Sequence, residues 1–342
     1  MDVQKKMREA PLSHIVSGIY SQSVAVAVAG VAVVVAYLAG GEQPFCTLDA
    51  LICQAQEWLS IERVMAYGVH FAEIVFAALT LSYMAYSRNV IRTRSKLPGI
   101  FFVLFCCSYP ACFLEPLSGT FMAVILAVVF LILFSPSTEF RLPLHLYVVS
   151  FFFSAAGVLY PSLFLYIPVI WLGSAKIASF GFKCLLASFL GIITPFWLLG
   201  AAQVIWDFSF CFQHFVGHFY PLQLIDFRHL SFPLIYTAVV AFIGFFCWAR
   251  NTVLQYEDKI ITRIYNGMIN LLFFYTLVLI CLNYSGFPVY LPILTVCVSL
   301  QAAHCFTHVQ GRQGAFWFYL IITVFILFFL WNLFQNLVTG VI

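Results

Sequence analysis

One glutamate and one histidine stand out in this chain because they lie three residues apart inside an apolar run. Glu73 is the only carboxylate well inside such a run, and a helix would place His70 on the same face. A carboxylate and an imidazole in this arrangement can handle a proton or bind a polar headgroup. A protonated glutamate that is hydrogen-bonded inside a helical bundle explains the pair equally well. Both interpretations stay open on sequence grounds.

A second set of polar side chains lies in the segment 205–220. If this segment is helical, Asp207, His214 and His218 share one face, and aromatic residues cover much of the rest. These three residues are candidates for catalysis or headgroup contact, but an amphipathic helix in a membrane interface explains the same pattern without chemistry. The two histidines also have a spacing that zinc sites use. They lack the companion residues of a known zinc class, so we predict no metal.

A third set of candidates precedes the apolar run that begins near residue 64. Glu57 and Glu62 fall where multi-span transferases that use lipid-linked sugars keep a catalytic carboxylate, although acids also collect outside simply because bases are kept inside. Cys46 and Cys53 could close a disulfide in an oxidising compartment, and two free thiols near the interface are the alternative.

The rest of the chain has the composition of a membrane protein. Of its 342 residues, 63% are hydrophobic, 18% are aromatic and only 8% are charged, a balance that would aggregate in water. Apolar runs of roughly 13 to 24 residues alternate with the charges, and only helices satisfy their own backbone in hydrocarbon. We therefore predict an all-α polytopic transmembrane helical bundle of about eleven spans, with residues 1–342 as a single integral membrane domain. The predicted spans are 16–38, 64–83, 97–114, 117–134, 144–158, 162–174, 183–203, 231–248, 266–283, 287–305 and 315–334.

Two of these spans, 144–158 and 162–174, are short helices in the central part of the sequence. The second would be only about 20 Å long against a hydrocarbon core of about 30 Å. One interpretation extends it toward Phe180, with Lys176 reaching the interface. The other is a hairpin of half-helices that lines a cavity.

The basic residues predict the orientation, because Lys and Arg collect in cytoplasmic loops. With the N-terminus inside and the C-terminus outside, only Arg63 and Arg228 fall outside, and the larger external loops are 39–63 and 204–230. His304 and His308 then lie at the inner end of a span with no acid nearby in sequence, and we interpret them as interfacial. The basic residues assigned to the cytoplasmic side are Lys5, Lys6, Arg8, Arg88, Arg92, Arg94, Lys96, Arg141, Lys176, Lys183, Arg250, Lys259, Arg263 and Arg312.

Several apolar motifs extend over most of the chain. They are Leu159-Tyr160-Pro161-Ser162-Leu163-Phe164, Trp171-Leu172-Gly173, Leu190-Gly191-Ile192-Ile193-Thr194-Pro195, and the stretch from Ser87-Arg88-Asn89 to Ser108-Tyr109-Pro110. This pattern resembles an uncharacterised family of polytopic inner-membrane proteins of the Bacteroidota. The resemblance implies a multi-pass protein of the bacterial inner (plasma) membrane. It transfers no catalytic residue, because the motifs are structural and the family has no established activity.

Two classes of function fit these observations, with a third behind them. The first is an enzyme or carrier for a polyprenyl-linked or lipid-linked cell-envelope precursor, acting at an outward-facing site. The second is a non-enzymatic scaffold or assembly subunit of an inner-membrane complex, and the third is a small-solute transporter, which the scarcity of intramembrane charge disfavours. We predict membrane lipids, a polyprenyl-linked substrate or other inner-membrane proteins as partners, and no cofactor. Nucleic acid is not expected, because topology explains the basic residues and the net charge is only +3.

Overall fold

The computed structural model describes residues 19–39, 63–92, 95–109, 119–135, 141–177, 180–206, 232–283, 287–307 and 312–339. Within these ranges every regular element is helical, with eleven α-helices, two short 3₁₀ helices and no strand, so the all-α prediction is confirmed for this part of the chain. Six of the helices are long and apolar enough to cross a membrane. The α-helices are α3 (Ile19–Ala39), α5 (Arg63–Ser87), α6 (Leu97–Ser108), α8 (Gly119–Leu133), α9 (Leu142–Leu159), α10 (Tyr166–Ile177), α11 (Phe182–Trp206), α13 (Phe232–Val253), α14 (Ile260–Leu282), α15 (Phe287–Phe306) and α16 (Arg312–Thr339).

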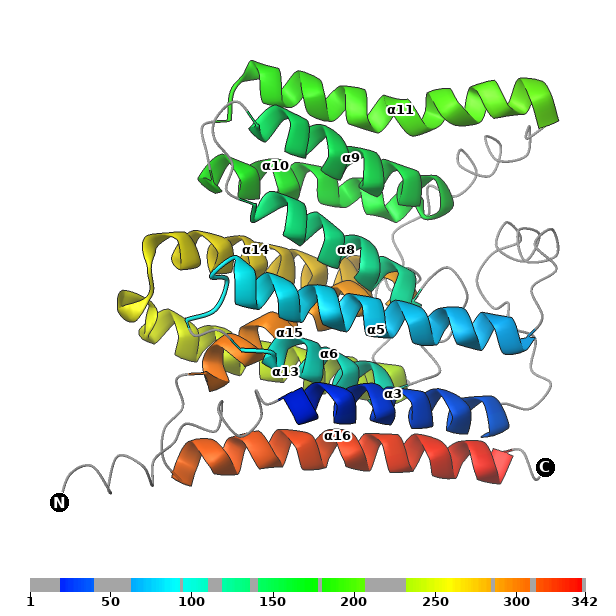
Figure 1. The fold of residues 1–342 in the computed structure, drawn as a ribbon, viewed down its shortest axis with the longest axis vertical. Coiled ribbons are helices and arrows are strands. Elements are labelled where there is room, and N and C mark those ends of the chain that lie inside the picture. The colour runs from blue at the N-terminus through cyan, green and yellow to red at the C-terminus, as the bar shows by residue number, and fades with distance from the viewer. Residues whose placement is uncertain are drawn as a thin grey trace.

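The helices lie side by side and form a stack that is elongated across their axes (Figure 1). α11 forms one edge of the stack and packs on α9, while α16 forms the other edge and packs on α3 and α6. Consecutive helices alternate in direction, so successive connections fall at opposite ends of the bundle (Figure 1). Because of this alternation, every second connection lies at the same end of the bundle, and side chains that are far apart in sequence can meet there.

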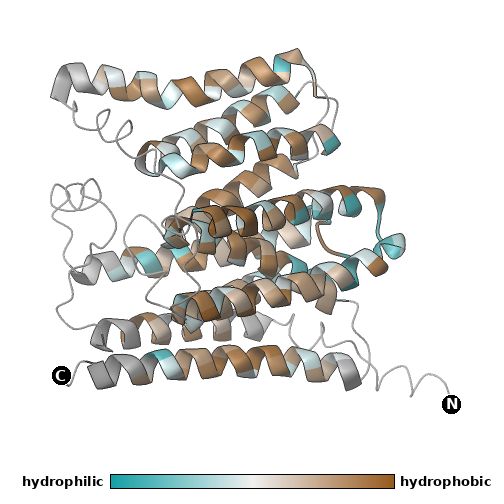
Figure 2. Ribbon diagram, turned by 180° about the vertical axis from the view of Figure 1, so that it is seen from behind, coloured by the Kyte–Doolittle hydropathy of each residue, from teal (hydrophilic) through white to brown (hydrophobic). Residues whose placement is uncertain are grey.

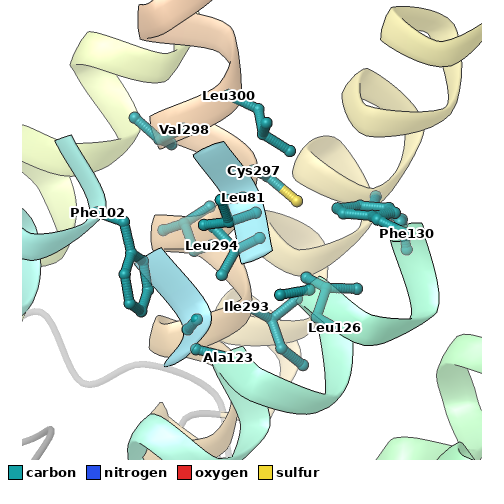
Figure 3. Packing of buried hydrophobic residues seen from close by; sticks show 14 of the residues in the cluster. Leu81, Phe102, Ala123, Leu126, Phe130, Ile293, Leu294, Cys297, Val298 and Leu300 are labelled. Carbon is teal, nitrogen blue, oxygen red and sulfur yellow. The ribbon is translucent and has the colours of Figure 1, made fainter. Parts of the chain in front are cut away.

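The centre of the bundle is α15, which is buried along its whole length. It packs against α6, α8, α13 and α14. In Figure 3, Leu81 of α5, Phe102 of α6 and Phe130 of α8 surround Leu294 and Cys297 of α15, all of them nearly or fully inaccessible. α15 carries no Asp, Glu, Lys or Arg and can therefore be buried on every side, although other helices of the bundle are at least as apolar.

One end of the bundle is joined by polar contacts between distant segments, and we call it the basic end. There the Thr262 hydroxyl donates to the Asn89 carbonyl oxygen at 2.8 Å, and the Tyr265 hydroxyl donates to the Phe134 carbonyl oxygen at 3.1 Å. Polar residues gather at the turn between α13 and α14 (Figure 2). The described basic residues at this end are Arg88, Arg92, Lys96, Arg141, Lys176, Lys183, Arg250, Lys259, Arg263 and Arg312, whereas Arg63 begins α5 at the opposite end.

The α5–α6 connection turns sharply at this basic end. Asn89 has a φ of 53°, in the left-handed region that asparagine tolerates better than most residues and that commonly ends a helix. Lys96 then precedes α6, whose first turn contains Pro98, a position where the missing N–H costs nothing. A side chain at Gly99 would overlap Ser82 and the Ala78 carbonyl, so glycine there lets α6 approach α5 closely.

The two short helices of the sequence are longer than predicted. α9 contains 18 residues, and a five-residue 3₁₀ helix, Pro161–Leu165, leads directly into the 12 residues of α10. The 3₁₀ helix and α10 together rise about 28 Å, close to the roughly 30 Å of a hydrocarbon core. Lys176 lies exposed in the last turn of α10. These lengths favour the extended helix over a hairpin of half-helices. The ring of Tyr166, at the start of α10, lies beside the ring of Tyr290 of α15, with the ring centroids 6.3 Å apart.

α11 is held against α9 by small and hydroxyl-bearing side chains. The Ser150 and Ser188 oxygens lie 2.5 Å apart, and the Ser154 hydroxyl donates to the Ile192 carbonyl oxygen at 2.7 Å. The other face of α11 is apolar and open, with Trp197 75% exposed. Small residues at the contact and large apolar residues outside are the arrangement expected for a helix that borders lipid.

Candidate functional site

The first candidate site joins α5 and α8 near the end opposite the basic one. His70 and Glu73 lie one turn apart on α5, with the His70 Nδ1 atom 3.3 Å from the Glu73 Oε2 atom. Thr120, in the first turn of α8, lies against both residues. Its hydroxyl is 3.2 Å from His70 Nδ1 and donates a hydrogen bond to Glu73 Oε2. The three side chains form one connected cluster, the His70–Glu73–Thr120 site.

With Glu73 ionised, the bonds of this site assign the tautomer of His70. The single hydroxyl proton of Thr120 goes to Glu73, so the Thr120 oxygen accepts from His70 Nδ1, which must carry a proton. In the neutral ring the Nε2 atom is then an acceptor, and this buried atom has no partner among the described residues. A histidine oriented by a carboxylate in this way is equipped to take up a proton at its free nitrogen.

The site borders the outer surface of α5. His70 and Thr120 are buried, whereas the Glu73 side chain is 15% exposed. Val69 and Phe76, which flank Glu73 at four and three residues, are 46% and 52% exposed. A carboxylate held from the inside and open at the edge can therefore contact a molecule that approaches along this face.

A second candidate site lies at the basic end. Arg92 of the α5–α6 connection donates to both carboxylate oxygens of Asp258, from Nε to Oδ1 at 2.5 Å and from Nη2 to Oδ2 at 3.3 Å. Its Nη2 atom also donates to the Leu254 carbonyl oxygen at 2.7 Å. His304, at the end of α15, places its Nε2 atom 3.1 Å from Asp258 Oδ2. Arg92, Asp258 and His304 are 8%, 2% and 0% exposed, so this triad is buried.

The electrostatics of the triad favour an ionised aspartate. Burial alone would raise the pKa of Asp258, but the hydrogen bonds from His304 and Arg92 outweigh it and hold that pKa below its usual value. Glu257 adds a second carboxylate, with its Oε2 atom 4.0 Å from Arg92 Nη1. Breaking a buried pair of this kind leaves an unpaired charge, which typically costs about 3–5 kcal/mol. The triad therefore fixes the α13–α14 turn to α15 and to the α5–α6 connection.

Polar contacts continue from the triad into the α13–α14–α15 contact. The Gln301 amide donates to Asn270 Oδ1 at 2.8 Å, and the Asn251 amide donates to the Gln301 carbonyl oxygen at 3.0 Å. Asn266 of α14 lies 3.4 Å from His304 Nε2. Side-chain amides on all three helices thus meet at this contact, where Asn251 and Gln301 are buried and Asn266 and Asn270 are partly exposed.

The interpretation of His304 as interfacial is wrong. Its side chain is fully buried, and the acid that it lacks in sequence is Asp258, 46 residues earlier. Only the chain fold brings the two together, although a histidine in the last turn of a helix without Asp, Glu, Lys or Arg was a signal that it needed a partner. His308 lies outside the described residues.

Most of the other sequence candidates also lie outside the described residues. This holds for Asp207, His214, His218, Glu57, Glu62, Cys46 and Cys53, so their proposed roles stay predictions. Among the residues that the structure describes, no group of three or more His, Cys, Asp or Glu side chains could hold a metal ion.

Comparisons with known proteins identify no relative of this chain. No family model, no curated protein and no solved structure matches the chain. The resemblance to a Bacteroidota inner-membrane family stays a prediction.

Proposed function

We propose that this protein is a multi-pass protein of the bacterial inner membrane that binds a polyprenyl-linked or lipid-linked envelope precursor at an outward-facing site around His70, Glu73 and Thr120. The observation that carries the proposal is the edge position of Glu73, held by two buried partners beside an exposed apolar strip. A lipid tail can lie along that strip while its polar head meets the carboxylate. His70 Nε2 then provides a proton acceptor next to the head.

The eleven-span topology belongs to the same proposal. Its support is the alternation of eleven helices and the gathering of the described basic residues at one end. With that end in the cytoplasm, the His70–Glu73–Thr120 site faces the outer half of the membrane.

Photolabelling tests the site directly. The purified protein in lipid nanodiscs is exposed to a polyprenyl phosphate that carries a photoreactive group, and labelled peptides are mapped by mass spectrometry. We expect labelling within 67–76 or 119–125, competed by unlabelled polyprenyl phosphate but not by the same concentration of phosphatidylglycerol. Equal competition by both lipids, or labelling spread evenly over the outer faces of α11 and α16, would overturn the site.

Cellular complementation then separates binding from stability. Glu73→Gln and Thr120→Val should lose function at normal membrane abundance. Thr237→Val is the matched control, because the Thr237 hydroxyl bonds only to Pro233 of its own helix among the contacts described.

A scaffold or assembly subunit is the second candidate, and the observation that favours it is the complete burial of α15. Tightly packed side chains around α15 suit a structural subunit, which does not need a path for a substrate through the bundle. Full complementation by the Glu73 and Thr120 variants, together with co-purification of a stable inner-membrane partner, would favour this function over the first.

A further inference from the structure

A group of basic side chains surrounds the start of α9 at the basic end of the bundle. Arg88 directly follows α5, while Arg141 and His145 lie at the start of α9. The ends of α5 and α8 and the start of α9 lie at the same end of the stack, and α8 packs on both of the other helices (Figure 1). We call these three side chains the Arg88–Arg141–His145 cluster.

Contacts on three helices place the members of this cluster near one another. The His145 backbone nitrogen donates to the Arg141 carbonyl oxygen at 3.0 Å, so these two side chains are one turn apart on one face of α9. The charges of Arg88 and Arg141 both act on the His145 ring. Arg88 also acts on Tyr265 of α14, whose ring stacks on Phe134 at the end of α8 with 4.3 Å between the ring centroids. Arg88 therefore lies near the end of α8 as well as the start of α9.

Two buried nitrogen atoms of the cluster have no hydrogen-bond partner among the described residues. They are Arg88 Nε, which is always a donor, and His145 Nδ1, which is a donor when it carries the ring proton. Buried polar atoms are nearly always paired, so these atoms call for an acceptor. Arg88 and His145 are partly exposed as whole residues and Arg141 is exposed, so a molecule from outside can reach the cluster.

No carboxylate in the described part of the chain supplies this acceptor. Glu73 bonds to His70 and Thr120 near the other end of the bundle, and Glu257 and Asp258 form ion pairs with Arg92. The backbone adds further donors, because α9 has no side-chain hydrogen bond at its N-cap and the first N–H groups of a helix have no partner within it. The cluster thus combines positive charge with spare donors.

We propose that the Arg88–Arg141–His145 cluster binds a phosphate group. Phosphate oxygens accept several hydrogen bonds at once, and arginine recognises them with two parallel N–H groups. The headgroup of an anionic phospholipid and a free phosphate ion both have this chemistry. Leu144, beside His145, is 61% exposed and gives an acyl chain an apolar surface next to the phosphate. The site does not depend on the proposed outward-facing lipid site, which lies toward the other end of the bundle.

Thermal unfolding of the purified full-length protein in detergent tests the proposal. Phosphatidylglycerol, phosphatidylcholine or inorganic phosphate is added at one ionic strength, so that charge screening is constant. A lipid site predicts a saturating rise of the unfolding temperature, about 2–4 °C, with phosphatidylglycerol relative to phosphatidylcholine, and no rise with inorganic phosphate. A site for the free ion predicts a similar rise with inorganic phosphate relative to chloride. Either result supports the phosphate site and identifies its source.

Variants of the cluster locate the effect. Arg88→Gln and Arg141→Gln should each reduce the rise by at least half. Lys259→Gln is the matched control, because it removes one positive charge from an exposed position at the same end, and it should keep the rise. Since Arg141 is exposed, Arg141→Gln provides the test even where Arg88→Gln does not fold.

Two results would overturn the site. The first is a wild-type unfolding temperature that responds to neither phosphatidylglycerol nor inorganic phosphate. The second is an equal loss of the rise in Arg141→Gln and Lys259→Gln, which would mean that the overall charge of the basic end attracts phosphate and that the cluster has no special part in binding it.

Discussion

The protein contains two pairs of a histidine and a carboxylate, and they are built in opposite ways. His70 and Glu73 are three residues apart on one helix, whereas His304 and Asp258 are 46 residues apart and meet only through the fold. In each pair one ring nitrogen contacts the carboxylate and the other is buried without a partner among the described residues. The local pair reaches the edge of the bundle, but the long-range pair is closed off by Arg92.

This difference in position and bonding suggests different roles: the His70–Glu73 pair can contact a ligand, whereas the His304–Asp258 pair stabilises the fold. Glu73 has no arginine beside it in the contacts described, and its loss disturbs only α5 and α8. Asp258 is bonded by Arg92 and His304 at once, so its loss releases three segments. We therefore expect mutations of the first pair to affect function and mutations of the second to affect stability.

The largest expected effect is an all-or-none difference in chemical labelling, which reports the side of the membrane on which each histidine–carboxylate pair lies. A membrane-impermeant maleimide applied to intact cells should not label Lys259→Cys, an exposed position at the basic end, and should label it fully after permeabilisation. After mild reduction, the same reagent should label Cys46 or Cys53 in intact cells. Labelling of Lys259→Cys in intact cells would reverse the orientation and place His70 and Glu73 in the cytoplasmic half.

The next largest effect is on stability at the basic end. Arg92→Ala should destabilise the protein by about 3–5 kcal/mol, because it leaves Asp258 as an unpaired buried charge. The measurement is unfolding of the purified protein in mixed detergent micelles, with Arg263→Ala at an exposed position as the matched control. If Arg92→Ala lost no more stability than Arg263→Ala, the Arg92–Asp258–His304 triad would not stabilise the α13–α14 turn.

Glu73→Gln should destabilise the protein by less than about 1 kcal/mol, because the amide oxygen can still accept from Thr120 and His70. Glu73→Lys should lower membrane abundance instead, since it directs a cation at the proton on His70 Nδ1. Abundance in isolated membranes and unfolding in detergent check both expectations. A strong loss of stability in the Gln variant would make the local pair structural as well.

The smallest effect is a dependence of stability on acid pH. The pKa of Asp258 is lower in the folded protein than in the unfolded chain, so its ionisation stabilises the fold above the unfolded value of about 4. This contribution should be lost as the pH falls from about 5 through the folded pKa. An unfolding-temperature profile over that range should be flatter for Asp258→Asn than for the wild type, and parallel profiles would contradict a lowered pKa.

The sequence by itself determined the helical class, the approximate positions of the helices and the closeness of His70 to Glu73. Each of these depends on short-range rules: an apolar run must close its own backbone hydrogen bonds as a helix, and residues three apart share a helix face. The same rules could not find Thr120 as the third member of the cluster, because it lies 47 residues from Glu73 on another helix. They also placed His304 wrongly at an interface.

Only the tertiary structure decided which helix is central and which charges meet. Several helices are at least as apolar in sequence as α15. What distinguishes α15 is that neighbouring helices bury it along its whole length. Arg92, Asp258 and His304 come from three separate segments, and no local spacing links them. The physical reason is that burial and ion pairing at these positions depend on distances between helices, which the packing of the whole bundle sets and the periodicity of one segment does not.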